Sequence, residues 1–287
     1  MFRSLLFIPG NNPRFLEKSK VLKPDILCFD LEDSIPKSDK SNARTLVHSI
    51  FQTQFEFKSN VFVRINSLDD LPDSSLDIDM IIHKGLTGIV VPKVNNSVEI
   101  SKLSEKLSFL ESKRNIDNGT IKIIPSIETA KGVVNAHSIA ESNDRVIAIV
   151  FGIYDFLYDM NIDYFESDES IYRYARSKIP VDSRAAGIDA LDGIWQNVED
   201  INGLINDTRI SKQLGYTGRT IIHPKHIDPV HDVFRYSTRE IEWAKKVIDA
   251  LSNSFEGDKS RGAVTVEGKM VDAVHFKQAR LILDSIK

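Results

Sequence analysis

The sequence predicts a closed TIM-type (β/α)8 barrel, in which eight parallel strands alternate with helices. Eight short runs rich in Val and Ile recur along the 287 residues, and several are apolar throughout, as in parallel strands buried on both faces. The segments between them are long enough for crossover helices. An open doubly wound sheet is the second choice, because the IPGNNP segment after the first run is not the GxGxxG fingerprint that would favour such a sheet.

Each expected strand is a short apolar run, and the helices lie in the polar or amphipathic segments between the runs. The strands are expected at 4–8, 26–30, 61–65, 88–91, 121–126, 146–151, 192–195 and 219–222. Two of the helices are expected at 96–110 and at 131–141, where apolar side chains recur on one helical face. A barrel of this type takes about 250 residues, which leaves a short extension.

The C-terminal part of the chain exceeds what a barrel requires. Ser237 and Glu240 predict a capping box at the start of a long helix, and a polar stretch follows at 253–262. We therefore expect a catalytic barrel domain at 1–252 and a C-terminal extension at 253–287 that ends in a helix. The extension is either a packing helix or a lid or swapped arm that covers the active site of a neighbouring subunit.

Composition excludes several classes of protein. The net charge is −4 and Lys and Arg form no basic stripe, so no nucleic-acid partner is expected. No run approaches the roughly 18 apolar residues of a membrane span, and no signal-peptide cleavage site follows the first apolar run, so we expect a soluble, cytoplasmic protein. Cys28 is the single cysteine, which rules out an intrachain disulfide, and it is expected to be a small buried strand residue.

Polar residues stand where the expected strands end. In a barrel of this type the active site lies at the carboxyl ends of the strands, so these side chains are expected to meet at one mouth. A set this rich in acids is not needed for folding. The residues are Asp30, Glu32 and Asp33 after the second strand, Arg64 in the third, Lys93 after the fourth, Glu128 after the fifth and Asp155 after the sixth.

Two of these acids suit a magnesium ion. Mg²⁺ prefers oxygen ligands and is usually held by one or two carboxylates together with substrate and waters, which Glu128 and Asp155 can provide. Arg64 can hold a substrate carboxylate through two parallel hydrogen bonds. A metal that binds a 2-oxo acid polarises its carbonyl group, so these parts favour aldol or Claisen-type chemistry on a small oxo acid. The alternative is that Glu128 only caps the following helix and that Asp155 is a loop acid.

A series of motifs makes a family resemblance specific. In order, they are RSLLFIPG, FDLEDSIP, VRIN, GIVVPKV, IIPSIETAKGV, VFGIYDF, GYTGRTIIHP and GKMVDAVH. Together they resemble the motifs of the citrate lyase beta-subunit-like family of the HpcH/HpaI aldolase superfamily, which includes malyl-CoA, methylmalyl-CoA and citramalyl-CoA lyases. The match runs from Arg3 to about Gln278, and so covers nearly the whole chain.

The resemblance implies roles for the residues at the barrel mouth. Glu128 and Asp155 correspond to the ligands of Mg²⁺, for which Mn²⁺ could substitute. Arg64 corresponds to the residue that binds the oxo-acid carboxylate and stabilises the enolate oxygen. The acids of the DLED motif correspond to residues beside the metal that bond its water molecules; of these, Asp30 and Asp33 are expected to be catalytic and Glu32 to bind substrate.

The resemblance also implies roles outside this group. In relatives that use CoA, an Asp of the C-terminal tail exchanges the proton on the acetyl methyl carbon in a neighbouring subunit's site, and here that residue is Asp272. Asn12 and Arg14 lie where relatives contact the CoA chain and its phosphates, and Lys93 is expected to contact the ligand. CoA enters as part of the substrate. The chain is expected to form a homotrimer or a homohexamer.

The leading function is that of an Mg²⁺-dependent carbon–carbon lyase acting on a 3-hydroxyacyl-CoA thioester of the malyl-CoA or citramalyl-CoA type, with a 2-oxo acid as the second product. One alternative is a citrate lyase beta subunit that acts on citryl-acyl-carrier protein with partner subunits. Another is a related enzyme that hydrolyses the thioester after condensation. A non-catalytic ligand-binding barrel is less expected, because such a protein has no reason to keep Glu128, Asp155, Arg64 and Asp272 together.

Overall fold

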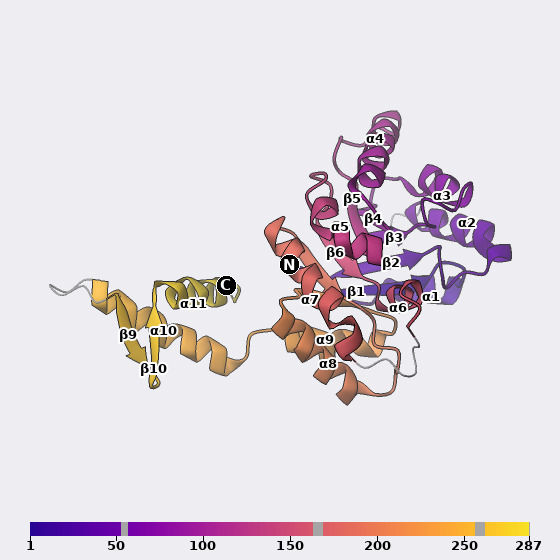
Figure 1. Ribbon diagram of the computed structural model, residues 1–287. Helices are drawn as coiled ribbons and strands as arrows, with labels where there is room; N and C mark the ends of the chain where they lie inside the picture. The colour runs from indigo at the N-terminus through magenta and orange to yellow at the C-terminus, as the bar shows by residue number, and fades with distance from the viewer. Residues whose placement is uncertain (53–56, 163–168, 256–261, 287) are drawn as a thin grey trace. The chain divides into compact units, whose positions relative to one another are not determined.

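The computed structural model describes residues 1–52, 57–162, 169–255 and 262–286, and it shows a closed barrel followed by a smaller C-terminal unit (Figure 1). The chain divides into two compact units, Met1–Phe234 and Arg235–Lys287. Within the described residues, no helix is long and apolar enough to cross a membrane.

Eight parallel strands form the barrel in sequence order. The first strand pairs with the second on one side and with the eighth on the other, where Ser4 lies opposite Arg219, so the ladder has no open edge. The expectation of a TIM barrel is therefore confirmed. The strands are β1 (Ser4–Pro9), β2 (Ile26–Asp30), β3 (Asn60–Arg64), β4 (Gly88–Val91), β5 (Lys122–Ile127), β6 (Ala148–Phe151), β7 (Asp189–Asp192) and β8 (Gly218–Ile221).

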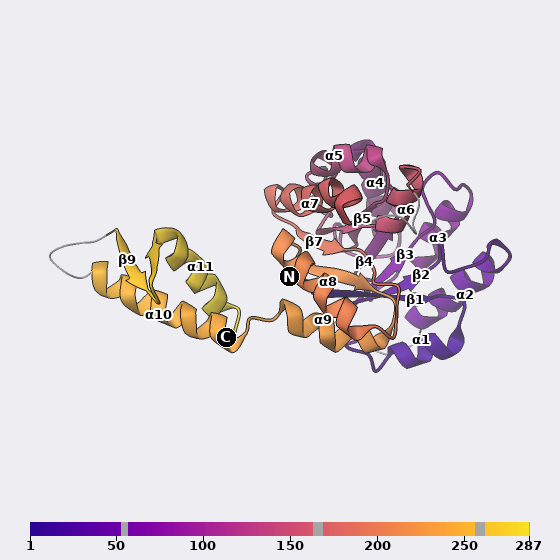
Figure 2. The same cartoon turned by 60° about the horizontal axis from the view of Figure 1, so that its bottom comes forward.

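Helices surround the strands on the outside of the barrel (Figure 2). Most of them connect one strand to the next, as right-handed βαβ units require. They are α1 (Pro13–Ser19), α2 (Lys40–Phe51), α3 (Asp73–Ile81), α4 (Ser97–Lys113), α5 (Ala130–Ala140), α6 (Ile153–Asp159), α7 (Glu169–Ala185), α8 (Ile201–Leu214) and α9 (Ile227–Phe234), with short 3-10 turns η1 (Lys37–Asp39) and η2 (Pro224–His226).

Alternation along each strand creates two apolar layers. In β2, Ile26 and Cys28 face the barrel interior, whereas Leu27 and Phe29 pack against the surrounding helices. Both faces of the strand are thus buried, which explains why the four residues ILCF before Asp30 are all apolar. Cys28 is a free, fully buried thiol, as expected, and burial raises its pKa well above the ordinary value.

The expected strands agree with the structure to within one or two residues except at the seventh. That strand was expected at 192–195 but lies at Asp189–Asp192, and the DGIW segment continues beyond it. The error has a local cause, because the residues of β7, DALD, include no β-branched or aromatic side chain. The strand forms because both of its neighbours, β6 and β8, offer it a parallel hydrogen-bonding edge.

The C-terminal unit is a helix–hairpin–helix. It contains α10 (Thr238–Phe255), β9 (Ala263–Val266), β10 (Lys269–Asp272) and α11 (Ala273–Asp284), and the two strands pair antiparallel. The hairpin turn consists of Glu267 and Gly268, which both have positive φ, as a two-residue type I′ turn requires.

The unit boundary differs from the expected one. It lies at Phe234 rather than after residue 252, because α10 contributes Ala244, Val247 and Leu251 to the small core of the C-terminal unit. The capping box at the start of α10 forms as expected, with Ser237 N donating to Glu240 Oε2 at 2.7 Å. The hairpin itself was not predicted from the sequence. That this unit covers a neighbouring active site stays a prediction.

A buried ion pair ties α4 to the segment before β6, and its loss should destabilise the protein. Arg145 donates to both carboxylate oxygens of Glu111, at 2.8 and 2.6 Å, and both side chains are buried. Glu111→Gln leaves the guanidinium without a charge partner, so we expect urea unfolding to show a loss of about 3–5 kcal/mol in the free energy of unfolding.

The pH dependence of this contribution follows from the Glu111 carboxyl. Burial raises its pKa, but the bonds from Arg145 and from the backbone N–H groups of Ile121 and Gly119 outweigh burial and lower it. The stabilisation is therefore present above the ordinary pKa of glutamate and is lost as the pH falls through the lowered value. Glu199→Gln, which removes the exposed partner of Lys225, is the control and should leave the unfolding midpoint unchanged.

Candidate active site

The barrel register brings the predicted polar residues in or directly after β2, β3 and β5 to one mouth. Asp30 and Arg64 are register partners at the ends of β2 and β3. Asp30 lies two and four residues after the interior residues Cys28 and Ile26, and Arg64 lies two residues after the interior residue Phe62, so both side chains continue interior rows. Alternate side chains of neighbouring strands therefore converge at the carboxyl end of the barrel.

Asp30 and Arg64 form a bidentate ion pair. Arg64 donates from Nε and Nη2 to the two carboxylate oxygens of Asp30, at 2.6 and 2.7 Å. Burial raises the pKa of Asp30, but Arg64 and the bond from Ser34 prevail and lower it to about 2. Burial lowers the pKa of Arg64, yet the charges of Asp30, Glu32 and other nearby acids keep it well above its ordinary value.

This pairing changes what Arg64 can offer to a ligand. The sequence predicted two parallel hydrogen bonds from Arg64 to a substrate carboxylate, but Asp30 already binds the Nε–Nη2 edge. Nη1 lies 3.2 Å from Glu32 and 3.6 Å from Asp33. The guanidinium also lies over the ring of Phe7, 4.6 Å from its centroid, which fixes the plane of the group. Each nitrogen of the guanidinium therefore already contacts an acid of the protein.

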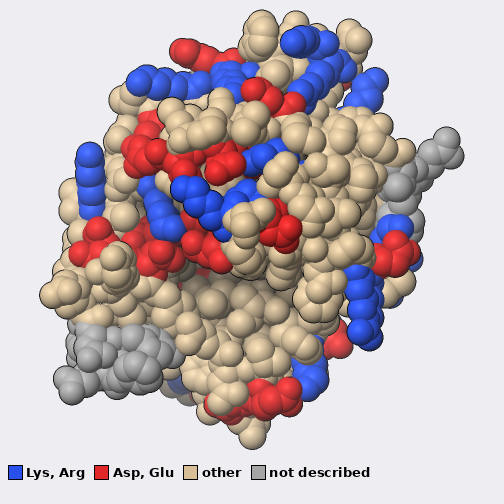
Figure 3. Space-filling model, turned by 90° about the vertical axis from the view of Figure 1, so that its right-hand side faces the viewer, with Lys and Arg blue, Asp and Glu red and all other residues tan. Residues whose placement is uncertain are grey.

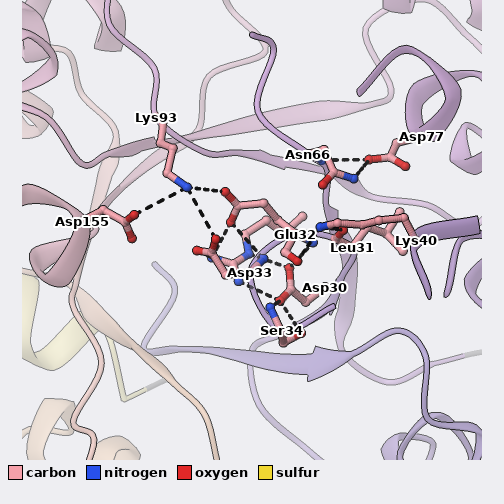
Figure 4. Close-up of polar contacts among 11 residues, drawn as sticks. Asp30, Leu31, Glu32, Asp33, Ser34, Lys40, Asn66, Asp77, Lys93 and Asp155 are labelled. Atoms are coloured by element: carbon pink, nitrogen blue, oxygen red, sulfur yellow. Dashed lines mark hydrogen bonds and ion pairs between the residues drawn. The ribbon is translucent and has the colours of Figure 1, made fainter. Parts of the chain in front are cut away.

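Lys93 links the acids of β2 to Asp155 in the first turn of α6 (Figure 4). Its Nζ lies 2.6 Å from Glu32 and 3.5 Å from both Asp33 and Asp155. Lys93 has a left-handed backbone, with φ of 56°, which a residue with a side chain rarely adopts and which is common at functional sites. Burial lowers the pKa of its amine, but Glu32 and the other acids raise it above the ordinary value.

Glu32 and Glu128 are two buried acids with raised pKa values. Burial, opposed by Arg64 and reinforced by the charge of Asp33, raises the pKa of Glu32 to about 7. Burial raises the pKa of Glu128 to about 8, with further contributions from the charges of Glu32 and Asp155. Such shifts are typical of functional sites, where like charges are held together out of water.

The side chain of Glu128 is closely packed, and its hydrogen bonding is incomplete. Its Oε2 atom is buried and has no hydrogen-bond partner. Gly152 makes room for it, because a Cβ atom at this position would lie 2.3 Å from Cγ of Glu128. The following residue of the chain opens α6, which carries Asp155. The FG pair that precedes Asp155 therefore allows the two acids to occupy the same corner of the barrel mouth.

These acids line a cavity of about 450 Å³ at the barrel mouth. Asp30, Asp33, Arg64, Glu128 and Asp155 all contribute to its walls. Figure 3 shows acidic and basic side chains gathered along one side of a hollow, with uncharged atoms on the other side. The uncharged lining residues include Phe7, Ile194, Gln196, Thr220 and Ile222, from β1, from β8 and its end, and from the segment after β7.

The carboxylates at the barrel mouth fit a magnesium ion that takes only some of its ligands from the protein. No cluster of three or more His, Cys, Asp or Glu side chains suited to a metal occurs in the part of the chain that the structure describes. Mg²⁺ needs only one or two carboxylates, because it retains waters and binds substrate oxygens. Glu128 has a buried oxygen without a partner and Asp155 is half exposed, so these two carboxylates would hold the ion.

The remaining predicted residues lie apart from this cluster. Asn12 caps α1 by accepting hydrogen bonds from the backbone of Arg14 and Phe15, and Arg14 is exposed. Asp272 belongs to the C-terminal unit, where it caps α11 and forms a capping box with His275. The bond from His275 outweighs partial desolvation and lowers the pKa of Asp272. The proposed contacts of Asn12, Arg14 and Asp272 with substrate stay predictions.

Several lining residues were not predicted from the sequence. Phe7, Ser34, Gly152 and Ile222 carry no charge that would mark them as candidates. Two of them could have been predicted from the alternation of side chains along a strand. Phe7 lies two residues after the interior residue Leu5, and so faces the interior. Ile222 lies two residues after Thr220, and so shares its face.

Comparisons with known proteins agree with the fold. Residues 3–224 match the model of the HpcH/HpaI aldolase/citrate lyase family. The citrate lyase subunit beta of Leuconostoc mesenteroides is 34% identical over 281 residues, which cover 98% of this chain and 92% of that protein. The human mitochondrial citramalyl-CoA lyase is 30% identical over 288 residues, covering 97% of this chain and 83% of that one.

One solved structure is similar to this chain over the residues of both units. The CitE protein of Mycobacterium tuberculosis, in complex with magnesium, acetoacetate and coenzyme A, has a TM-score of 0.80 and 24% identity, and the match covers 99% of this chain and 97% of that one. The expectation that the protein is a lyase is confirmed by the named relatives. From the extent of the family match and the identity to the Leuconostoc protein, the chain belongs to the HpcH/HpaI aldolase/citrate lyase family.

Proposed function

We propose that this protein is an Mg²⁺-dependent carbon–carbon lyase that cleaves a 3-hydroxyacyl-CoA thioester of the malyl-CoA or citramalyl-CoA type. The products are a 2-oxo acid and acetyl-CoA or a homologue. One observation carries the proposal: Glu128 is a buried acid with an unpartnered oxygen and a pKa raised to about 8, in a cavity that Asp155 also lines. Such an arrangement is unfavourable without a cation and favourable with one.

The relatives support both the ion and the class of substrate. One is named a citramalyl-CoA lyase, and another, from Cereibacter sphaeroides, is named a (3S)-malyl-CoA thioesterase. The related CitE protein was crystallised with magnesium, acetoacetate and coenzyme A. These names share a CoA thioester and a short oxygenated acid, which the 450 Å³ cavity is large enough to hold in part.

The residues of the barrel would act by placement and by charge. A magnesium ion held by Glu128 and Asp155 would supply Lewis acidity toward the oxygen of the oxo acid. Arg64 would bind the carboxylate and stabilise the negative charge that develops during cleavage. Asp30 holds the guanidinium in a fixed plane, so little reorganisation is needed when that charge appears. Lys93 holds Glu32 and Asp155 in position.

Asp272 would transfer the proton at the acyl carbon in the site of a neighbouring subunit. Cleavage of the carbon–carbon bond leaves its electron pair on the thioester as an enolate, which must gain one proton. The pKa of Asp272 is lowered by its bond with His275, so the carboxylate is ionised near neutral pH. That state suits a base, which removes the proton in the condensation direction. In cleavage, the substrate's 3-hydroxyl group would lose its proton as the carbon–carbon bond breaks and the oxo group forms. Asp272, after taking up one proton, would deliver it to the enolate carbon, so that one proton is lost and one is gained.

A second candidate is the beta subunit of a citrate lyase. The Leuconostoc and Haemophilus influenzae relatives carry this name and are 34% and 31% identical to the chain. This function would require citryl-acyl-carrier protein as substrate and additional subunits as partners. A homotrimer or homohexamer and a cytoplasmic location belong to the proposal as predictions from the sequence.

Turnover of two thioesters tests the function directly. We expect purified protein to cleave (S)-malyl-CoA or (S)-citramalyl-CoA in the presence of Mg²⁺ and to lose this activity when the metal is removed with a chelator, because the carboxylates alone supply no electrophile. Release of CoA-containing product and oxo acid is followed by chromatography. Cleavage of neither thioester, with turnover of citryl-acyl-carrier protein in the presence of partner subunits, would favour the second candidate.

Glu128→Gln should separate metal binding from folding. The variant keeps the shape of the side chain but removes its charge, so Mg²⁺ affinity, measured by calorimetry, should fall at least about tenfold and turnover about a hundredfold or more. Because like charges and burial disfavour the wild-type carboxylate, the metal-free variant should melt at the same or a higher temperature. Glu105→Gln, on the exposed face of α4, is the control. Unchanged Mg²⁺ affinity in Glu128→Gln would contradict the metal assignment.

Asp272→Asn should abolish proton transfer without affecting the metal. We expect loss of turnover and of deuterium exchange from solvent into the acetyl methyl group of acetyl-CoA, with Mg²⁺ affinity unchanged, because Asn cannot act as a base. Glu267→Gln, in the hairpin of the same unit, should retain exchange. Exchange at the wild-type rate in Asp272→Asn would rule out this residue as the base.

A further inference from the structure

Lys93 contacts acids on both sides of the barrel mouth. It lies two residues after β4, and its amine stands between Asp155 on one side and Glu32 and Asp33 on the other (Figure 4). Nζ lies 2.6 Å from Glu32 and 3.5 Å from both Asp33 and Asp155. Among the described residues, the only ion pair of Asp155 is the one with Lys93. The carboxylate that would hold the metal from α6 is therefore already paired with a cation of the protein.

Hydrogen bonds fix the turn from which this side chain leaves the backbone. Lys93 has a left-handed backbone, with φ of 56°. Asn95 donates from Nδ2 to the carbonyl oxygen of Lys93 at 3.0 Å, and Thr129 donates to Oδ1 of Asn95 at 2.6 Å. Thr129 directly follows Glu128, so the turn is tied to the segment that carries this acid. Only rotation of the Lys93 side chain can therefore move its charge.

The amine of Lys93 has a charge of the same sign as the metal. Burial lowers its pKa, but Glu32 and the other acids raise it above the ordinary value, so the amine is a cation at neutral pH. A magnesium ion held by Glu128 and Asp155 would share the carboxylate of Asp155 with this amine. Like charges in a partly buried site repel each other more strongly than in water, because screening by water and salt is weaker there.

We infer that Lys93 is an internal counter-ion that lowers the affinity of the site for Mg²⁺. It neutralises Asp155, Glu32 and Asp33 while the metal is absent, and the ion has to compete with it for Asp155. The inference rests on the proposed function and adds to it, because it assigns to Lys93 a role toward the metal. An ion that the protein holds weakly depends more on substrate oxygens to complete its coordination. Mg²⁺ and the oxo acid would then each increase the affinity for the other.

Mg²⁺ binding to neutral variants of Lys93 tests this role. Lys93→Met and Lys93→Gln both remove the charge, and Gln keeps a hydrogen-bond donor for Glu32. We expect calorimetry on the full chain to show that both variants bind Mg²⁺ at least about tenfold more tightly than the wild type. A residue that only holds Asp155 in position would have the opposite effect, because its loss would weaken binding. Lys113→Met, which removes an exposed lysine at the end of α4, is the control and should leave the affinity unchanged.

Thermal unfolding provides a second measurement that does not depend on turnover. Without Mg²⁺, both neutral variants should melt at a lower temperature than the wild type, because Glu32, Asp33 and Asp155 lose a cation that they share. At the same Mg²⁺ concentration, the rise in melting temperature should be larger in the variants, because tighter binding stabilises the folded state more. An equal or smaller rise in the variants would contradict the inference.

The outcomes separate this inference from the lyase proposal. If the wild type binds Mg²⁺ and both neutral variants bind it equally or more weakly, the inference is overturned and the lyase proposal stands. Tighter binding by the variants, with no cleavage of either thioester by the wild type, would support the inference and contradict the lyase proposal. If Mg²⁺ does not bind to the wild type, both are wrong. If one of the two variants does not fold, the other decides in the same way.

Discussion

Hydrogen bonding between β1 and β8 closes the barrel, and every property of the site depends on that closure. A closed ladder has no free edge and directs the carboxyl ends of all eight strands to one mouth. Because side chains alternate, Asp30 and Arg64 at the ends of their strands continue the rows that fill the interior below them. A shift of one residue in the register of β2 or β3 would turn these charges toward the outer helices.

The mouth gathers more negative charge than the protein itself neutralises. Asp30 is matched by Arg64, and Glu32 is matched in part by Lys93. Glu128 has no comparable partner: one of its oxygens is buried without a hydrogen bond, and its pKa is raised to about 8. Elsewhere the barrel satisfies its buried charges, as in the pair of Arg145 and Glu111. The contrast marks the mouth as the part of the barrel where stability has been exchanged for binding.

The lining of the cavity includes a charged wall, with Asp30, Asp33, Glu128 and Asp155, and an uncharged wall, with Phe7, Ile194 and Ile222. The charged wall carries the residues that the family motifs include, and it would perform the step common to relatives with different substrates. The uncharged wall includes residues such as Ile194 and Ile222, which cannot be recognised in the sequence by a charged side chain. Changes in this second wall could alter which oxo acid fits while leaving the metal and Arg64 in place, which is how one barrel supports several activities.

The sequence by itself determined the barrel, the approximate place of most strands and the group of acids at their ends, because these follow from local patterns of apolar and polar residues. It did not determine β7, whose four residues become a strand only between two neighbours, or the unit boundary at Phe234, which depends on how α10 packs. Only the tertiary structure decided that Asp30 binds the Nε–Nη2 edge of Arg64 and that one oxygen of Glu128 has no hydrogen-bond partner. These properties arise from contacts between residues distant in the chain, and local patterns carry no information about such contacts.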